Sequence, residues 1–170
     1  LEKLYICDLS NVKCFGMEFY GSDCTSCNDG VFPSLKRLSI YDLPKLQEWM
    51  EVVERDGLIF PCLEVFRIHG CPMLKNLPNH FSSLKELRIG GEVGVEECCI
   101  NSASLTEVRI LDCPDLMKLK WGVNLDVEGS DGLLFPFLSR LYLKGLPKLV
   151  EWKKGGGGDV STSSASTSNP

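Results

Sequence analysis

The sequence predicts an α/β-type repeat fold, a solenoid with a curved parallel β-sheet on its concave face, little regular helix and irregular long loops. The 170-residue chain contains 25 leucines, and one short apolar phrase recurs along it six times. The rest of the composition, 44% hydrophobic and 24% charged, is typical of one soluble globular domain. No stretch approaches the roughly 18 to 20 consecutive apolar residues of a membrane helix, which excludes a membrane-spanning protein. The net charge of −5 argues against a protein that coats nucleic acid.

The recurring phrase is Leu-x-x-Leu-x-Ile-x-x-(Leu/Cys)-Pro-x-Leu. Four full copies and two shorter ones begin at Leu1, Leu35, Leu63, Leu84, Leu105 and Leu138. Their starts lie 34, 28, 21, 21 and 33 residues apart, near the roughly 20 to 29 residues of a leucine-rich repeat. We therefore expect a leucine-rich-repeat domain over residues 1–154.

Each copy predicts one short strand whose alternate residues point inward, such as Leu38 and Ile40 in the second copy. Pro44 and its equivalents lack an amide hydrogen and end the strand region. One repeat cannot bury its own apolar face, so the copies are expected to stack and their strands to form one continuous parallel sheet. Replacing a well-buried leucine such as Leu38 or Leu141 with alanine should then cost about 2–5 kcal/mol.

The cysteines indicate a reducing compartment. Nine is an odd number, and no Asn-x-Ser/Thr glycosylation acceptor occurs. Cys71 and Cys113 take the ninth position of the phrase, where we expect them to act as small apolar residues with a weak S–H donor. Cys24 and Cys27 have the spacing of half a metal site but no second pair, so we predict no metal. We expect a cytoplasmic protein, with a nuclear or peripheral membrane location left open.

Long insertions separate the repeat cores at residues 11–31, 47–59 and 118–134. The second insertion is acidic, and we expect at most one turn of helix there. Trp49 and Trp152 occupy the same position in two copies and are predicted to pack along the back of the solenoid. Residues 155–170, which are rich in Gly, Ser and Thr, are predicted to be a disordered tail.

The residues between the inward positions are expected to form columns on the concave face, about 4.8 Å apart from strand to strand. Three arginines, Arg67, Arg88 and Arg109, align in one column, and Glu86 and Glu107 stand beside them. The alignment has two interpretations: a solvated charged surface with weak local ion pairs, or a docking surface for an acidic protein. The docking interpretation predicts a protein-binding face made of Tyr5, Arg37, Tyr41, Arg67, His69, Arg88, Arg109, Arg140 and Tyr142.

No residue pattern indicates catalysis. His69 has no serine or cysteine nucleophile beside it with an orienting acid, and His80 lies in a turn after Pro78. No pair of carboxylates has a spacing that suggests acid–base work. We therefore expect no catalytic residues and no enzyme activity.

Three segments carry a resemblance to a known family. The run Gly16–Gly21 reads Gly-Met-Glu-Phe-Tyr-Gly, Phe32–Leu38 opens Phe-Pro-Ser-Leu, and Leu43–Trp49 reads Leu-Pro-Lys-Leu-Gln-Glu-Trp. Together with the Cys-Pro turns at Cys71 and Cys113, they resemble the C-terminal leucine-rich repeats of plant coiled-coil nucleotide-binding disease-resistance proteins, the intracellular immune receptors called NLRs. The resemblance covers roughly residues 1–154.

The resemblance implies a role in plant defence. The repeats of such receptors sense a pathogen effector, or a host protein that it modifies, and hold an ATP/ADP-binding switch domain inactive. The expected partners are therefore an effector or host protein and the receptor's own nucleotide-binding domain. This chain lacks a Gly-x-x-x-x-Gly-Lys-Ser/Thr phosphate loop, so ATP or ADP is expected only in an upstream domain. Because the chain opens on Leu1, we expect a piece of a longer protein.

A repeat of this kind also suits two other binding roles. The alternative is a substrate-recognition repeat of an F-box ubiquitin-ligase adaptor, which would need an F-box segment. An extracellular receptor repeat is disfavoured by the unpaired thiols and the missing glycosylation acceptors.

Overall fold

The computed structural model describes residues 1–20, 32–50, 60–78, 81–100, 102–121 and 137–154. The tail predicted for residues 155–170 lies outside them, as do His80, Cys24, Cys27 and most of each long insertion. The insertion at 47–59 is described only as far as residue 50, so its predicted turn of helix falls on residues that the structure does not describe.

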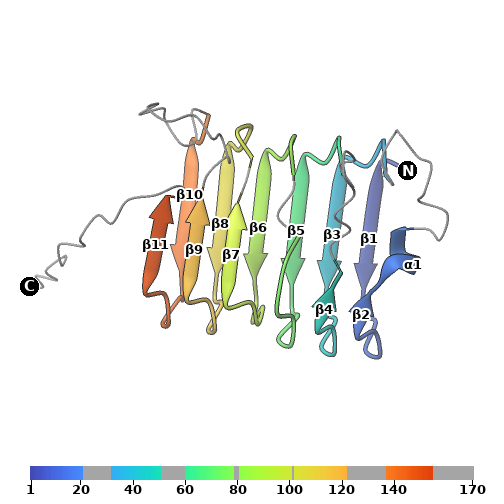
Figure 1. Cartoon of the computed structure of the whole chain (residues 1–170), viewed down its shortest axis with the longest axis horizontal. Helices are drawn as coiled ribbons and strands as arrows, with labels where there is room; N and C mark the ends of the chain where they lie inside the picture. Colours follow the sequence, from blue (N-terminus) through green and yellow to red (C-terminus); the bar gives the residue numbers. More distant parts are fainter. Residues whose placement is uncertain (21–31, 51–59, 79–80, 101, 122–136, 155–170) are drawn as a thin grey trace, which may run out of the picture.

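Each of the six copies forms one strand of a single parallel sheet, and the strands lie side by side in chain order (Figure 1). This arrangement confirms the parallel repeat sheet that the phrase predicts. Its strands are β1 (Lys3–Cys7), β3 (Arg37–Tyr41), β5 (Val65–His69), β6 (Glu86–Gly90), β8 (Glu107–Leu111) and β10 (Arg140–Lys144).

Shorter strands form a second layer of parallel sheets. A three-stranded sheet contains β7 (Glu97–Ile100), β9 (Lys118–Trp121) and β11 (Glu151–Lys154), and a two-stranded sheet pairs β2 (Cys14–Phe15) with β4 (Glu48–Trp49). In Figure 1 the arrows of β7, β9 and β11 run opposite to those of the six-stranded sheet. Among the described residues the only helix is α1 (Met17–Tyr20), which agrees with the expectation of little regular helix.

The core is built on the inward residues of the phrase, and buried residues of the second layer, such as Ile100 of β7, belong to it as well. Leu38 and Ile40 of β3 are completely buried, and Val108 and Ile110 repeat this pattern in β8. Burial of these alternate positions follows from the two-residue period of a strand.

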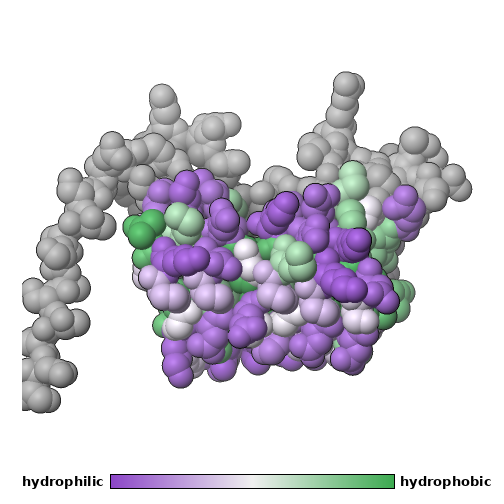
Figure 2. All heavy atoms as spheres, turned by 90° about the horizontal axis from the view of Figure 1, so that it is seen from below, coloured by the Kyte–Doolittle hydropathy of each residue, from purple (hydrophilic) through white to green (hydrophobic). Residues whose placement is uncertain are grey.

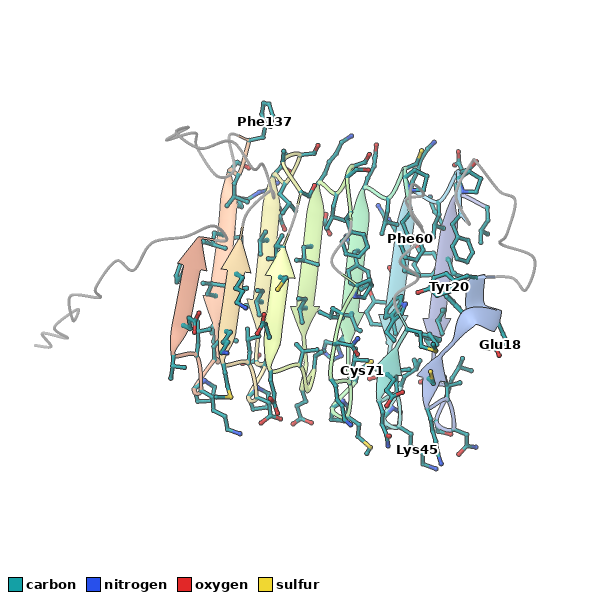
Figure 3. The ribbon with its side chains drawn as sticks, viewed as in Figure 1. Glu18, Tyr20, Lys45, Phe60, Cys71 and Phe137 are labelled. Atoms are coloured by element: carbon teal, nitrogen blue, oxygen red, sulfur yellow. The ribbon has the colours of Figure 1, made fainter. Side chains whose placement is uncertain are left out.

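Aromatic rings extend the core beside β3 and β5. The indole N–H of Trp49 donates a 2.6 Å hydrogen bond to the hydroxyl of Tyr20, which in turn donates to the carbonyl of Met50 at 2.8 Å. Phe60 packs against Tyr20 with ring centroids 6.5 Å apart (Figure 3). Trp49 is 1% exposed, so the prediction that it packs in the interior is confirmed.

Burial fails in the last copy. Leu141 is 38% exposed and Trp152 is 55% exposed. They belong to β10 and β11, which are edge strands, and no further described strand covers them. The prediction that Trp152 packs like Trp49, and the premise that Leu141 is as well buried as Leu38, are therefore wrong.

The two phrase cysteines behave as the sequence predicts. Cys71 and Cys113 are completely buried. Each thiol donates to the carbonyl two residues earlier, that of His69 or Leu111, at 3.6 Å. Burial raises the pKa of Cys71 and raises that of Cys113 to about 11, so both remain neutral thiols near pH 7.

The residue after each strand of the six-stranded sheet is an aspartate or a glycine with positive φ. These residues are Asp8, Asp42, Gly70, Gly91, Asp112 and Gly145. Four of their N–H groups extend the ladder by one bond, as from Asp42 to the His69 carbonyl at 3.0 Å and from Gly70 to the Gly91 carbonyl at 2.9 Å. Glycine, and less often aspartate, adopts a backbone conformation with positive φ at low cost.

The strands of the six-stranded sheet point toward the edge at the bottom of Figure 1. Figure 2 views this edge from below and shows a mainly hydrophilic surface.

Gly70→Ala is expected to destabilise the fold. Gly70 has φ +67°, and a Cβ there would lie 2.2 Å from Asp42 Oδ1. The backbone strain alone should cost about 1–2 kcal/mol in the free energy of unfolding, measured by urea denaturation. In an Asp42→Gly background the clash is absent and the same change should cost less. An equal cost in both backgrounds would show that the carboxylate contact contributes nothing.

Leu38→Ala and Leu141→Ala should differ. Leu38 is fully buried, so its truncation should lower the free energy of unfolding by about 2–5 kcal/mol. Leu141 is already 38% exposed, so its truncation should lower the free energy of unfolding by clearly less. Parallel urea denaturation of the two variants tests this order, and a larger loss for Leu141→Ala would contradict the described packing.

Candidate protein-binding face

The strand register places the predicted columns side by side. From β1 to β10, the first column runs Lys3, Arg37, Val65, Glu86, Glu107 and Arg140, and the second runs Tyr5, Ser39, Arg67, Arg88, Arg109 and Tyr142. The third column runs Cys7, Tyr41, His69, Gly90, Leu111 and Lys144. We call the surface made by these three columns the outer face. Its columns are those that the spacing of the phrase predicts.

Arg67 and Arg88 are held together by Glu86. Arg67 Nη2 lies 2.7 Å and Arg88 Nε 2.8 Å from the same oxygen, Glu86 Oε1. Arg88 Nε is buried and not aligned for a hydrogen bond, so its contact with Glu86 is purely an ion pair. The side chains of Arg67 and Arg88 are 27% and 38% exposed, and the ion pairs of both are made with glutamates of the same sheet.

Glu107 is the centre of a second cluster. Its side chain is only 6% exposed, and three guanidinium groups converge on it. Arg109 Nε lies 2.5 Å from Glu107 Oε1, Arg88 Nη2 lies 3.2 Å from the same oxygen, and Arg140 Nε lies 3.0 Å from Oε2. Glu86 and Glu107 thus offset the repulsion of the arginine column, as the sequence predicts.

The pKa of Glu107 reflects two opposed effects. Burial by itself raises the pKa of this carboxyl, because water solvates the charged form best. The hydrogen bond from Arg109 and the charges of the three arginines outweigh burial and hold the pKa below its ordinary value. Glu107 therefore stays ionised well into the acid range.

Tyr142 and Arg140 complete the C-terminal end of the outer face. The Arg109 guanidinium carbon lies 4.5 Å from the centroid of the Tyr142 ring, a cation–π contact. Such a contact is worth about 0.5–1 kcal/mol at an exposed site and restrains both side chains. Tyr142 is 44% exposed, and the side chain of Arg140 is 59% exposed. This end of the face combines restrained cationic and aromatic groups with access to solvent.

The remaining predicted residues lie at the other end of the face. Tyr5 on β1 is 55% exposed, and Arg37 on β3 is partly buried. The rings of Tyr41 and His69 are 6.5 Å apart, and His69 Nδ1 lies 3.9 Å from Asp42 Oδ1. The nine predicted residues share one surface but form two groups, and their role in binding stays a prediction.

Sequence reasoning missed the central position of Glu107. The sequence places Glu107 beside the arginines but assigns it no more than charge compensation. The approach of Arg140 to Glu107 depends on the pairing of β10 beside β8, although residues 111 and 140 are separated by a long insertion. The one feature of the sequence that points to this role is the place of Glu107 in its column, between Glu86 and Arg140.

The described residues contain no group of three or more His, Cys, Asp or Glu side chains that could hold a metal ion. Among the described residues the one helix, α1, has four residues and is far too short to cross a bilayer.

Two curated relatives are similar to about half of the chain. "Disease resistance RPP8-like protein 3" of Arabidopsis thaliana is 35% identical over 98 residues, which are 52% of this chain and 10% of that protein. "Disease resistance protein RPH8A" of the same plant is 37% identical over 94 residues, 54% of this chain and 10% of that protein. The resemblance to plant disease-resistance proteins is confirmed.

The matched segments span about a tenth of the length of these relatives. No family model matches the chain, and no solved structure matches it. The similarity to disease-resistance proteins therefore rests on relatives in sequence and on the repeat architecture.

Glu107→Gln should lower stability at neutral pH. The folded-state pKa of Glu107 is depressed, so its contribution to stability is full above the unfolded value of about 4.3 and disappears as pH falls through the folded value. The wild type should therefore be more stable than Glu107→Gln at pH 7, and the difference should shrink as pH drops below about 4. Urea denaturation at several pH values measures it, and a constant difference would contradict the ion-pair account.

Proposed function

We propose that this chain is a protein-binding leucine-rich-repeat segment of an intracellular plant immune receptor. In this role it senses a pathogen effector, or a host protein that the effector modifies, and contributes to holding the receptor inactive. The similarity to proteins named for disease resistance supports the defence role. The observation that carries the binding role is the outer face, where four arginines and two carboxylates form one connected cluster.

Charge distribution supports a protein partner. The chain has a net charge of −5, yet the cluster of Arg67, Arg88, Arg109 and Arg140 exceeds its two acids by two positive charges. A local cationic surface rich in arginine and tyrosine has the composition of protein-interaction hot spots. The surface suits a partner that presents acidic groups.

The proposal assigns the chain no reaction and no cofactor of its own. The partners are an effector or host protein and the nucleotide-binding domain of the receptor, and the location is the cytoplasm. The F-box adaptor role receives less support, since the relatives are named for disease resistance.

The experiment is complementation in the plant. A line in which the gene is disrupted is challenged with a panel of pathogen isolates, and the gene is then returned as wild type or variant. The combined change Arg140→Glu and Tyr142→Ala should abolish restored resistance, because both side chains are exposed on the outer face. Pathogen growth in leaves is the measurement, with protein level checked in the same tissue.

The matched control is Lys36→Ala with Lys85→Ala. These lysines are 54% exposed, pair only weakly with Glu2 and Glu64, and lie where strands begin rather than on the outer face. The control should restore resistance like the wild type. Equal resistance from both variants, or no change of resistance on gene disruption with any isolate, would contradict the proposal.

A further inference from the structure

Glu107 is shared by more guanidinium groups than it can neutralise. One buried carboxylate faces Arg88, Arg109 and Arg140, while Glu86 already serves Arg67 and Arg88. The closest contacts of Arg109 and Arg140 to Glu107 are made through Nε. A planar guanidinium has five donors, so contact at its Nε edge leaves further N–H groups for another acceptor.

The two guanidiniums are also fixed in position. Arg109 is held between Glu107 and the face of the Tyr142 ring, and Arg140 is tied to the other oxygen of Glu107. Their strands are hydrogen-bonded neighbours with Glu107 opposite Arg140. Preorganised donors lose less entropy when a ligand binds.

We propose that Glu107 acts as a positioning residue that presents Arg109, Arg140 and Tyr142 as a seat for a carboxylate side chain from an acidic segment of a partner protein. The inference rests on the proposed binding function and specifies its chemistry. Paired arginine donors match the two oxygens of a carboxylate, and the adjacent Tyr142 ring supplies apolar contact.

A protein carboxylate fits the seat better than a nucleic acid does. The excess of two positive charges suits one or two partner acids. Nucleic-acid binding relies on many phosphate contacts at once, and a chain of net charge −5 repels a polyanion.

Positioning and simple charge make opposite predictions. If only net charge attracted the partner, removing the negative charge of Glu107 would strengthen binding of an acidic peptide. If Glu107 positions the two arginines, Glu107→Gln weakens binding although the face becomes more positive. Arg140→Lys also distinguishes positioning from simple charge, since it keeps the positive charge but removes the planar guanidinium. Simple charge predicts unchanged binding, and positioning predicts weaker binding.

The test uses the full chain and a short fluorescent peptide of glutamate and glycine, with the same peptide carrying glutamine as control. Fluorescence anisotropy at low salt measures the dissociation constants. The acidic peptide should bind and the glutamine peptide should not. Arg140→Lys should weaken binding about fivefold or more, as expected when a bidentate charged contact is lost. Because the side chain of Arg140 is exposed, this substitution should leave the fold intact.

Lys85→Arg is the matched control, since it also exchanges lysine and arginine while keeping the charge. Lys85 lies just before β6 rather than on the outer face, its side chain is 54% exposed, and it pairs with Glu64 at 2.9 Å. This control should leave the dissociation constant within about twofold of the wild type, since charge is conserved and no guanidinium of the seat is altered. Equal effects of Arg140→Lys and Lys85→Arg would overturn the seat.

Three other results would also overturn the proposal. They are tighter peptide binding by Glu107→Gln with its fold intact, equal binding of the glutamate and glutamine peptides, and stronger binding of a single-stranded DNA oligonucleotide than of the peptide. Circular dichroism of each variant establishes whether the fold is intact.

The two proposals can fail separately. If the peptide does not bind while Arg140→Glu with Tyr142→Ala still abolishes resistance in leaves, the carboxylate seat is wrong and the receptor function stands. If the peptide binds as expected while resistance is unaffected, the seat stands and the proposed function falls.

Discussion

The parallel, in-register pairing of six strands is the constraint on which the rest of the structure depends. The register sends Leu38, Ile40 and their equivalents into the core and places their neighbours in straight columns on the outer face. A slip of one residue would exchange the two sets and expose the core. Four of the six Asp and Gly residues with positive φ that follow the strands add a further bond to the ladder and so help to hold the register.

The charge cluster on the outer face is a consequence of this pairing. Arginines on adjacent strands repel one another, and the sheet tolerates them because Glu86 and Glu107 stand in the next column. Burial strengthens these ion pairs, since the effective dielectric is lower than in water. The same cluster thus supports the fold and leaves positive charge and aromatic surface exposed at β10, so stability and the proposed recognition draw on one set of side chains.

Prediction from sequence succeeded where the information is local and repeated. The phrase located the six strands, the buried cysteines and the outward columns, because a strand has a two-residue period and each copy repeats the same contacts. It failed at Leu141 and Trp152, which match buried positions in other copies but are exposed on edge strands. Residue type describes what a position prefers, whereas burial also depends on the presence of a covering neighbour.

The sequence by itself determined the repeat architecture and the inward and outward sets of residues, since both follow from the order of residues within one copy. It also carried the similarity to disease-resistance proteins, through segments of several copies. Only the tertiary structure decided that Glu107 is buried under three arginines and that Arg109 stacks on Tyr142. The contacts of Arg140 with Glu107 and of Arg109 with Tyr142 join side chains from different copies across a long insertion. Their geometry depends on how β10 pairs with β8, a relation that no single copy of the phrase contains.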